Sequence, residues 1–244
     1  MIDIEFSPGL SARAVIAPPD VDGARLITQL GLPPASAVVA VNGSTAEGTS
    51  TPALTEAIVE GVGGAIINQG WTAVTGATDA GVFSLLGQAA EALAPRTPRA
   101  PWIGVAPLGL VTWPGHPSST DAVPLERHHS HFALVEGDKW GNETRALLAL
   151  TSALGERGAP SAAVIAGGGA MTRREAAGHA RAGRPIIVLG GSGRLADELA
   201  RAVTNDTQDD DELAGILRYG RVVVCDIADG PSSIAAALIV LLEG

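Results

Sequence analysis

Four glycine-containing stretches are the parts of this 244-residue sequence whose residue types suit ligand chemistry. Each follows a short apolar run and precedes a segment with helical periodicity. Glycine lets a backbone approach a ligand closely, and the N-terminus of a following helix offers free N–H groups and a partial positive charge. The expected ligand therefore bears phosphate. The stretches are 42–45 (NGST), 75–81 (TGATDAG), 167–172 (GGGAMT) and 190–194 (GGSGR).

Arginine is concentrated around the last two stretches. Residues 166–194 contain five arginines and one glutamate, in a chain whose net charge is −10. A guanidinium group binds phosphate in a bidentate manner, and Arg194 and one of Arg173 and Arg174 lie beside glycines. The candidate ligand-binding residues are therefore Asn42, Gly43, Ser44, Thr45, Thr75, Gly76, Ala77, Thr78, Gly81, Gly167, Gly168, Gly169, Met171, Thr172, Arg173, Gly190, Gly191, Ser192, Gly193 and Arg194.

Short apolar runs alternate with helical patterns along most of the chain. The runs are rich in valine and isoleucine without alternation, as in strands buried on both faces of a parallel sheet. The sequence therefore predicts one α/β domain over 1–244, with a Rossmann-like doubly wound, mainly parallel sheet and helices on both faces. The predicted strands cover 37–41, 71–75, 102–106, 131–135, 162–166, 185–189 and 221–225, with short ones at 2–6 and 13–17, and the predicted helices cover 54–66, 82–93, 142–154, 172–182, 194–202 and 232–242.

Two regions interrupt this alternation. The first is residues 1–36, which hold the two short strands and a connection rich in proline and glycine. The second is residues 107–127, a long loop that contains proline, serine and histidine, and a long loop in a compact domain is usually functional or disordered. We expect this loop to close over the base of a bound nucleotide. The acidic stretch 206–213 (DTQDDDEL) is expected to be a solvated surface loop.

The composition excludes several classes of protein. A net charge of −10 disfavours binding to nucleic acid or to an anionic membrane surface. The single cysteine, Cys225, rules out an internal disulfide, and the single lysine, Lys139, does not stand in a P-loop. The longest apolar run, 234–242, is too short to span a bilayer. We expect a cytoplasmic protein that requires neither a metal nor a cofactor.

Five segments, taken in order, resemble one family. They are similar to the LSDAT domain of the SLOG superfamily, which forms the N-terminal ligand-binding region of TRPM-type ion channels and also occurs in standalone prokaryotic proteins. The resemblance covers about 37–202 and implies a Rossmannoid fold that binds ADP-ribose or related NAD metabolites. It assigns ligand contacts to Thr75, Gly76, Gly81, Gly167, Gly168, Gly169, Thr172, Gly191, Ser192, Gly193 and Arg194. The segments are 74–89, 103–111, 128–138, 163–172 and 190–200, of which those with HSHF and GSGRLAD are the specific ones.

The chain departs from the channel pattern at two positions. Ala77 stands where the channels have a second glycine, and Leu147 stands where they have an arginine. The resemblance leaves Arg145 as the residue that would compensate for the missing arginine.

A second SLOG branch, the LOG phosphoribohydrolases, has the signature Pro-Gly-Gly-x-Gly-Thr-x-x-Glu. Residues 167–175 (GGGAMTRRE) resemble it except at Gly167 and Met171. This resemblance implies an alternative function, cleavage of the N-glycosidic bond of an AMP-like nucleotide, with Glu175 and the neighbouring Arg174 as candidate catalytic residues. A carboxylate can stabilise an oxocarbenium ion or activate water. An acid in the first turn of a helix is also favoured by the helix dipole, so a structural interpretation stays open.

The remaining reactive side chains have structural explanations. His128, His129 and His131 lack an evident further metal ligand, and Ser192 is one position away from a Gly-x-Ser-x-Gly elbow. The apolar run 234–242 suits either a homodimer contact or burial within the monomer. The sequence thus predicts a sensor or sequestering protein for a nucleotide-derived metabolite, ADP-ribose-like or NAD-like. A sensor would also have an effector protein as its partner, which the sequence does not identify.

Overall fold

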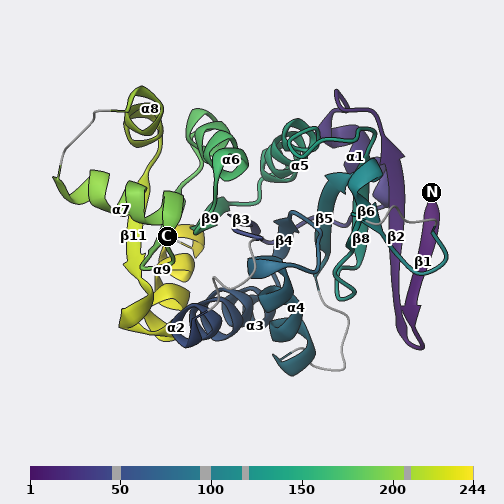
Figure 1. The fold of residues 1–244 in the computed structure, drawn as a ribbon, viewed down its shortest axis with the longest axis horizontal. Coiled ribbons are helices and arrows are strands. Elements are labelled where there is room, and N and C mark those ends of the chain that lie inside the picture. The colour runs from purple at the N-terminus through teal and green to yellow at the C-terminus, as the bar shows by residue number, and fades with distance from the viewer. Residues whose placement is uncertain (46–50, 94–99, 117–120, 206–209, 244) are drawn as a thin grey trace.

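A nine-stranded sheet forms the centre of the computed structural model, which describes residues 1–45, 51–93, 100–116, 121–205 and 210–243. The strand order is β1, β2, β8, β5, β4, β3, β9, β10, β11 (Figure 1). β1 pairs with β2 in the antiparallel sense, and every other pair in this sheet is parallel. The strands are β1 Ile2–Ser7, β2 Leu10–Ala17, β3 Val38–Gly43, β4 Thr72–Thr75, β5 Trp102–Pro107, β8 His131–Val135, β9 Ser161–Ala166, β10 Ile186–Gly190 and β11 Val222–Asp226. The predicted strands and the fold class are confirmed.

Helices cover both faces of the sheet (Figure 1). One face packs against α2 (Pro52–Glu56), the π-helix η1 (Ala57–Gly63), α3 (Gly64–Gln69), α4 (Gly81–Leu93) and α9 (Pro231–Glu243). The other packs against α1 (Gly23–Leu30), α5 (Thr144–Glu156), α6 (Ala170–Arg181), α7 (Arg194–Asn205) and α8 (Asp211–Tyr219). Short 3₁₀ turns, η2 (Leu108–Leu110) and η3 (Ile227–Asp229), complete the set. None of the described helices is long and apolar enough to cross a membrane.

The strand order reverses between β3 and β9, which lie side by side in parallel register. From β3 the chain proceeds through β4, β5 and β8 to one side, and from β9 it proceeds through β10 and β11 to the other. In open α/β sheets a crevice forms outside the carboxyl ends of the strands at such a switch point. The stretches 42–45 and 167–172 follow these two strands, so the topology brings them together.

Three segments differ from the sequence-based expectation or refine it. The prediction of a surface loop over 206–213 is wrong at 211–213, where α8 begins. Asp210 caps this helix by accepting the N–H groups of Glu212 and Leu213. Residues 206–209 lie outside the described ones. The helix α1 was missed because it has only eight residues. The predicted helix 54–66 contains η1, whose apolar residues recur every four positions, a wider repeat than the 3.6 residues of an α-turn.

The structure also shows how the long loop and the final helix are arranged. Within 107–127 the short strands β6 (Val111–Thr112) and β7 (Val123–Pro124) pair with each other, while 117–120 lie outside the described residues. In α9, Ile234, Leu238 and Leu242 are buried in the same core as η1 and α4. Burial within the monomer therefore explains these three positions of the segment 234–242, whereas Val240 is 66% exposed.

Candidate functional site

A cleft of about 520 Å³ lies at the switch point of the sheet. Its walls come from the loops after β3 and β4, the first turn of α6, the loop before α5 and part of the long loop. It combines apolar surface with carboxyl and hydroxyl groups. The residues that line it are Gly43, Thr45, Gly76, Thr78, Asp79, Ala80, Phe83, Asp121, Ala122, Val123, Pro124, Trp140, Glu143, Met171, Thr172 and Glu175.

Backbone contacts hold the loops after β3, β4 and β9 against one another. The N–H of Ser44 donates to the Ala166 carbonyl over 3.0 Å, and the N–H of Val82 donates to the Ser44 carbonyl over 3.1 Å. Gly81 opens α4 with a φ of +52°, and the absence of its side chain leaves room for that same Ser44 carbonyl. The rim of the cleft is therefore fixed by main-chain atoms.

The loop after β4 turns between two buried threonines. Thr75 Oγ1 accepts the N–H of Ala77 over 3.2 Å, and Ala77 has a φ of +68°. Thr78 is 1% exposed, and its hydroxyl oxygen has no hydrogen-bond partner among the described residues although Thr78 lines the cleft. Buried polar atoms are almost always paired, so this hydroxyl is an exception among the described residues of the cleft wall.

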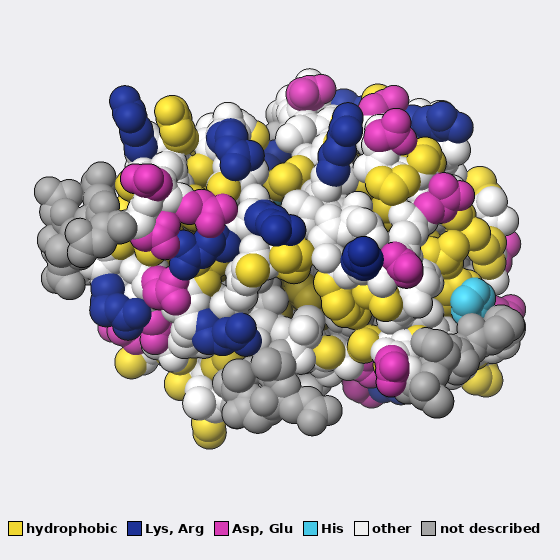
Figure 2. Space-filling model, turned by 45° about the horizontal axis from the view of Figure 1, so that its top comes forward, with side chains coloured by type: hydrophobic (Ala, Val, Ile, Leu, Met, Phe, Trp, Pro, Cys, Tyr) yellow, Lys and Arg dark blue, Asp and Glu magenta, His cyan; other side chains and the backbone are white. Residues whose placement is uncertain are grey.

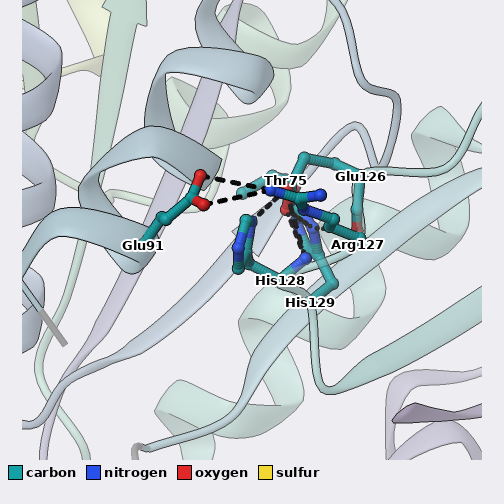
Figure 3. A network of polar contacts seen from close by, with 6 residues as sticks. All are labelled: Thr75, Glu91, Glu126, Arg127, His128 and His129. Atoms are coloured by element: carbon teal, nitrogen blue, oxygen red, sulfur yellow. Dashed lines mark hydrogen bonds and ion pairs between the residues drawn. The ribbon is translucent and has the colours of Figure 1, made fainter. Parts of the chain in front are cut away.

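Two histidines and a glutamate support this loop from behind (Figure 3). The Glu126 carboxylate accepts Nδ1–H of His128 over 2.7 Å and Nδ1–H of His129 over 2.9 Å. His129 Nε2 in turn shares a hydrogen bond of 2.7 Å with Thr75 Oγ1. Burial alone would raise the pKa of Glu126, but the hydrogen bonds and charges of the two histidines outweigh it and lower the pKa to about 2.

Thr75, His129 and Glu126 are hydrogen-bonded in the order of a hydrolase triad, but a substrate in the cleft could not reach the Thr75 hydroxyl. Thr75 is fully buried, its hydroxyl is held by Ala77, and neither Thr75 nor the histidines line the cleft. Within the described ranges, no group of three or more His, Cys, Asp or Glu side chains is placed to hold a metal ion. The histidine segment therefore acts as the framework that fixes the Thr75–Gly76–Ala77 turn.

A buried chain of hydrogen bonds orients Glu175. An Arg184 guanidinium N–H donates to His179 Nδ1 over 2.5 Å, and His179 Nε2 is 3.0 Å from Asn42 Oδ1. Asn42 Nδ2 then donates to Glu175 Oε2 over 3.0 Å. Since guanidinium has no acceptor, His179 must accept at Nδ1 and donate at Nε2, so the Asn42 amide can only donate to Glu175. Burial, and then the charge of Arg184, lower the pKa of His179 to about 3, which keeps this imidazole neutral.

Two carboxyl groups share the inner part of the cleft. Burial, and then the charge of Glu143, raise the pKa of Glu175 to about 8, while the Asn42 hydrogen bond acts in the opposite direction. Burial also raises the pKa of Glu143, whose Oε2 accepts the N–H of Gly141 over 2.7 Å. Raised carboxyl pKa values in a cleft are typical of functional sites.

A second pocket, of about 490 Å³, adjoins the cleft across the start of α6 and is basic on balance, because three arginines and two glutamates, Glu198 and Glu212, line it. Its lining includes Gly168, Gly169, Arg174 and Arg194. Arg173 also lines it, but its guanidinium is paired with Glu198 and with Asp210. Figure 2 shows basic and acidic side chains interspersed on the left part of the molecule, where α6, α7 and α8 lie. Arg174 and Arg194 are the cations of this pocket for which the described residues supply no carboxylate.

The loop after β10 is satisfied from within the chain. The Asp197 carboxylate accepts the N–H groups of Gly191 and Gly193, over 2.8 and 3.1 Å. Ser192 Oγ accepts the N–H of Gly167 over 2.8 Å, which ties this loop to the one after β9. The main-chain donors that the sequence pattern assigns to a phosphate therefore already have an anionic partner here.

A family model described as SLOG in TRPM, prokaryote, matches residues 36–236. The chain belongs to this family. It is also 29% identical, over 203 residues, to a transient receptor potential channel of Caenorhabditis elegans, an alignment that covers 72% of the chain and 10% of the channel. The SLOG chain thus spans about a tenth of the length of that relative. Among solved structures it resembles the molybdenum cofactor binding protein of Rippkaea orientalis, with a TM-score of 0.54 and 17% identity over 86% of this chain and 98% of that one, which shows the fold.

The predicted site residues of the SLOG chain fall into three groups. The first group lines the cleft and the second lines the basic pocket. The third lies at the ends of β3, β4, β9 and β10 or in the loops that follow them, and lines neither the cleft nor the basic pocket. The cleft takes Gly43, Thr45, Gly76, Thr78, Met171, Thr172 and Glu175; the basic pocket takes Gly168, Gly169, Arg173, Arg174 and Arg194; the rest are Asn42, Ser44, Thr75, Ala77, Gly81, Gly167, Gly190, Gly191, Ser192 and Gly193.

Sequence reasoning missed Glu143, Trp140, Asp79 and Phe83, which line the cleft of the SLOG chain. They stand on two segments, 79–83 and 140–143, which no spacing pattern joins, and Asp79 lies within the stretch 75–81 without having been selected from it. A usable signal was Trp140, a tryptophan in a polar turn of a chain with only 3% aromatic residues, which is 46% exposed. Leu147, at the position where the resemblance implies an arginine in the channels, belongs to α5 and is buried in the core.

Replacing Glu175 by glutamine is expected to raise the free energy of unfolding of the SLOG chain at alkaline pH. The folded protein retains this proton up to about pH 8, whereas the unfolded chain loses it near 4.5, so the stability of the wild type falls as pH rises through this window. Glutamine keeps the acceptor for Asn42 and cannot ionise. We expect a gain of roughly 1–3 kcal/mol at pH 8.5 and little change at pH 5, measured by urea unfolding. A variant less stable than the wild type at pH 8.5 would contradict the assignment.

Proposed function

We propose that this protein binds a nucleotide-derived metabolite that bears phosphate, ADP-ribose-like or NAD-like, and acts as a sensor or sequestering protein. The phosphates would lie against Gly168, Gly169, Arg174 and Arg194, and the nucleoside would enter the cleft. The observation that carries the proposal is the adjacency of a basic pocket and a deep cleft at the switch point, joined through the start of α6. Arg174 lies at this junction, with Nη1 3.8 Å from Met171 Sδ.

The chemistry of the two pockets supports this division. Helix α6 begins directly after Gly169, so its free N–H groups face the side where Arg174 and Arg194 stand. The cleft offers the aromatic faces of Trp140 and Phe83 for a base, and carboxyl and hydroxyl groups for ribose. Membership of the SLOG family is consistent with a ligand of this class.

A melting experiment tests the proposal. ADP-ribose, NAD⁺, AMP and ribose 5-phosphate are titrated against the protein, with adenosine as the ligand without phosphate. Binding to the native state raises the melting temperature in step with ligand concentration over the dissociation constant. We expect at least one phosphate-bearing ligand to do so and adenosine to have a much smaller effect. No shift with any of the five ligands would refute the proposal.

Substituting Arg194 by alanine should weaken a bound phosphate ligand by roughly ten- to hundredfold, since a charge-assisted hydrogen bond contributes about 1.5–3 kcal/mol. Its side chain is exposed and lines the basic pocket, so the stability of the free protein should change little. Arg181→Ala, at the exposed end of α6, removes the same charge outside both pockets and serves as the control. Equal losses for the two variants, measured by calorimetric titration, would point to the overall charge and not to a phosphate site.

A second candidate function is cleavage of an N-glycosidic bond, favoured by the two carboxyl groups of Glu175 and Glu143 in one cleft. A protonated carboxyl can assist a leaving base, and an ionised one can activate water. Incubation with AMP, cytokinin ribotides, NAD⁺ and ADP-ribose, followed by chromatography, tests it. Release of free base that is abolished by Glu175→Gln would establish the enzyme, and complete absence of product would leave binding alone.

A further inference from the structure

The cleft and the adjoining basic pocket differ in charge, because acids are the only described charged residues that line the cleft, whereas three arginines and two glutamates line the pocket. Asp79, Asp121, Glu143 and Glu175 line the cleft, and none of its lining residues in the described part of the chain is lysine or arginine. The two glutamates are buried, and the described residues give them an amide and a backbone N–H as partners but no cation. Buried carboxylates in proteins are normally paired with a positive charge. The described residues supply none here, and Glu175 instead retains its proton up to about pH 8, a proton that an entering cation would displace.

Two further features of the cleft indicate a bound molecule. The Thr78 hydroxyl is buried in its wall without a hydrogen-bond partner among the described residues. Trp140, which is 46% exposed, and Phe83, which is 6% exposed, also line the cleft, and the face of an aromatic ring attracts a cation as well as a flat ring. A flat, positively charged ring with a polar substituent would satisfy the carboxylates, the aromatic rings and the hydroxyl together.

We propose that the cleft selects a nucleotide whose base is a cation, namely an N-glycosidic pyridinium such as the nicotinamide end of NAD⁺. The inference rests on the proposed function, because the phosphates of the same molecule would occupy the basic pocket. It distinguishes among the ligands that the proposed function allows: ADP-ribose lacks the charged ring, and NADH carries a neutral one.

The ionisation of Glu175 sets the expected pH dependence of binding. The charged groups around Glu175 are Glu143 on the loop before α5, Asp79 after β4 and Asp121 on the long loop, with Arg184 behind His179 and Asn42. Glu175 holds its proton up to about pH 8, so its negative charge, and with it the attraction for a cation, grows as the pH rises past that value. Binding of a pyridinium should therefore release a proton near neutral pH.

Calorimetric titration of NAD⁺, NADH and ADP-ribose at pH 6.5 and pH 9 tests the inference. NAD⁺ and NADH have the same phosphates and nearly the same shape, so their ratio isolates the ring charge. We expect NAD⁺ to bind roughly tenfold or more tightly than NADH at pH 9, with a smaller preference at pH 6.5. In Glu175→Gln and in Glu143→Gln the preference should shrink, while Glu60→Gln, an exposed acid of η1 that lines neither pocket, should leave it unchanged.

The outcomes separate this inference from the function on which it rests. Equal binding of NADH and NAD⁺, or a preference that Glu175→Gln and Glu143→Gln leave intact, overturns the cation inference while the nucleotide site stands. Binding of ADP-ribose alone has the same meaning. No binding by any of the three dinucleotide-type ligands overturns the cation inference, and together with a failed AMP and ribose 5-phosphate titration it also removes the nucleotide site.

Discussion

Replacing Gly81 by alanine is expected to lower the free energy of unfolding by roughly 3 kcal/mol or more and to abolish ligand binding. A Cβ at this position would overlap the carbonyl oxygen of Ser44 and come within 2.7 Å of Thr45 Cα. Both neighbours are backbone atoms of the loop after β3, which cannot move aside without leaving the cleft. The φ of +52° adds the strain of a left-handed backbone. Urea unfolding and ligand titration measure the two effects.

Gly70 provides the matched control, because it also has a positive φ, +65°, but open space where a Cβ would stand. Gly70→Ala should cost only the conformational strain, about 1 kcal/mol, with binding retained. The difference between the two variants isolates the contact between the loops after β3 and β4. Similar losses for both would mean that the two loops are not locked together at Gly81.

Glu126→Gln should be the second strongly destabilising change, with a loss of roughly 2–4 kcal/mol at pH 7. The carboxylate accepts hydrogen bonds from the side chains of both His128 and His129 and from the His128 N–H (Figure 3). Glutamine replaces one acceptor oxygen by a donor, which leaves a buried histidine without its partner. Because His129 holds Thr75, the turn that lines the cleft should loosen as well.

The pH dependence checks the cause of this loss. The pKa of Glu126 lies at about 2, below its usual 4.5, so its contribution is present above pH 4.5 and is lost as pH falls toward 2. The stability gap between wild type and Glu126→Gln should therefore narrow over that range. Glu91→Gln, which removes the ion pair with Arg127 at a surface where both side chains are more than half exposed, should cost below about 1 kcal/mol at pH 7. A constant gap across the acid range would contradict the charge-based explanation.

The sheet could be predicted from the sequence because each strand is a local pattern. The runs around Val39, Val164 and Val188 are apolar on both faces, as only buried parallel strands are, and the crossover rule then fixes helices on both sides. The helix α8 was not predicted, because its first turn is acidic and acidic residues are common both in solvated loops and in the first turns of helices.

The candidate site could be predicted only where one segment carries it. Glu175 and the glycines of its loop stand within one motif, whereas Glu143, Trp140 and Asp79 meet them only in three dimensions. The sequence also could not show that Arg173 is already paired with Glu198, since the two are 25 residues apart. The orienting chain from Arg184 to Asn42 joins β3 to the end of α6 and has no pattern along the chain at all.

The Asp197 carboxylate beside Gly191 and Gly193 has a consequence for any anion in the surrounding solution. A carboxylate fixed on the same chain binds these amides without the loss of translational and rotational freedom that a dissolved ion suffers, a cost of about 4 kcal/mol or more. Inorganic phosphate or sulfate at ordinary buffer strength should therefore leave these two amides occupied by Asp197. Such salts would instead antagonise a ligand at Arg174 and Arg194, where no tethered competitor stands among the described residues.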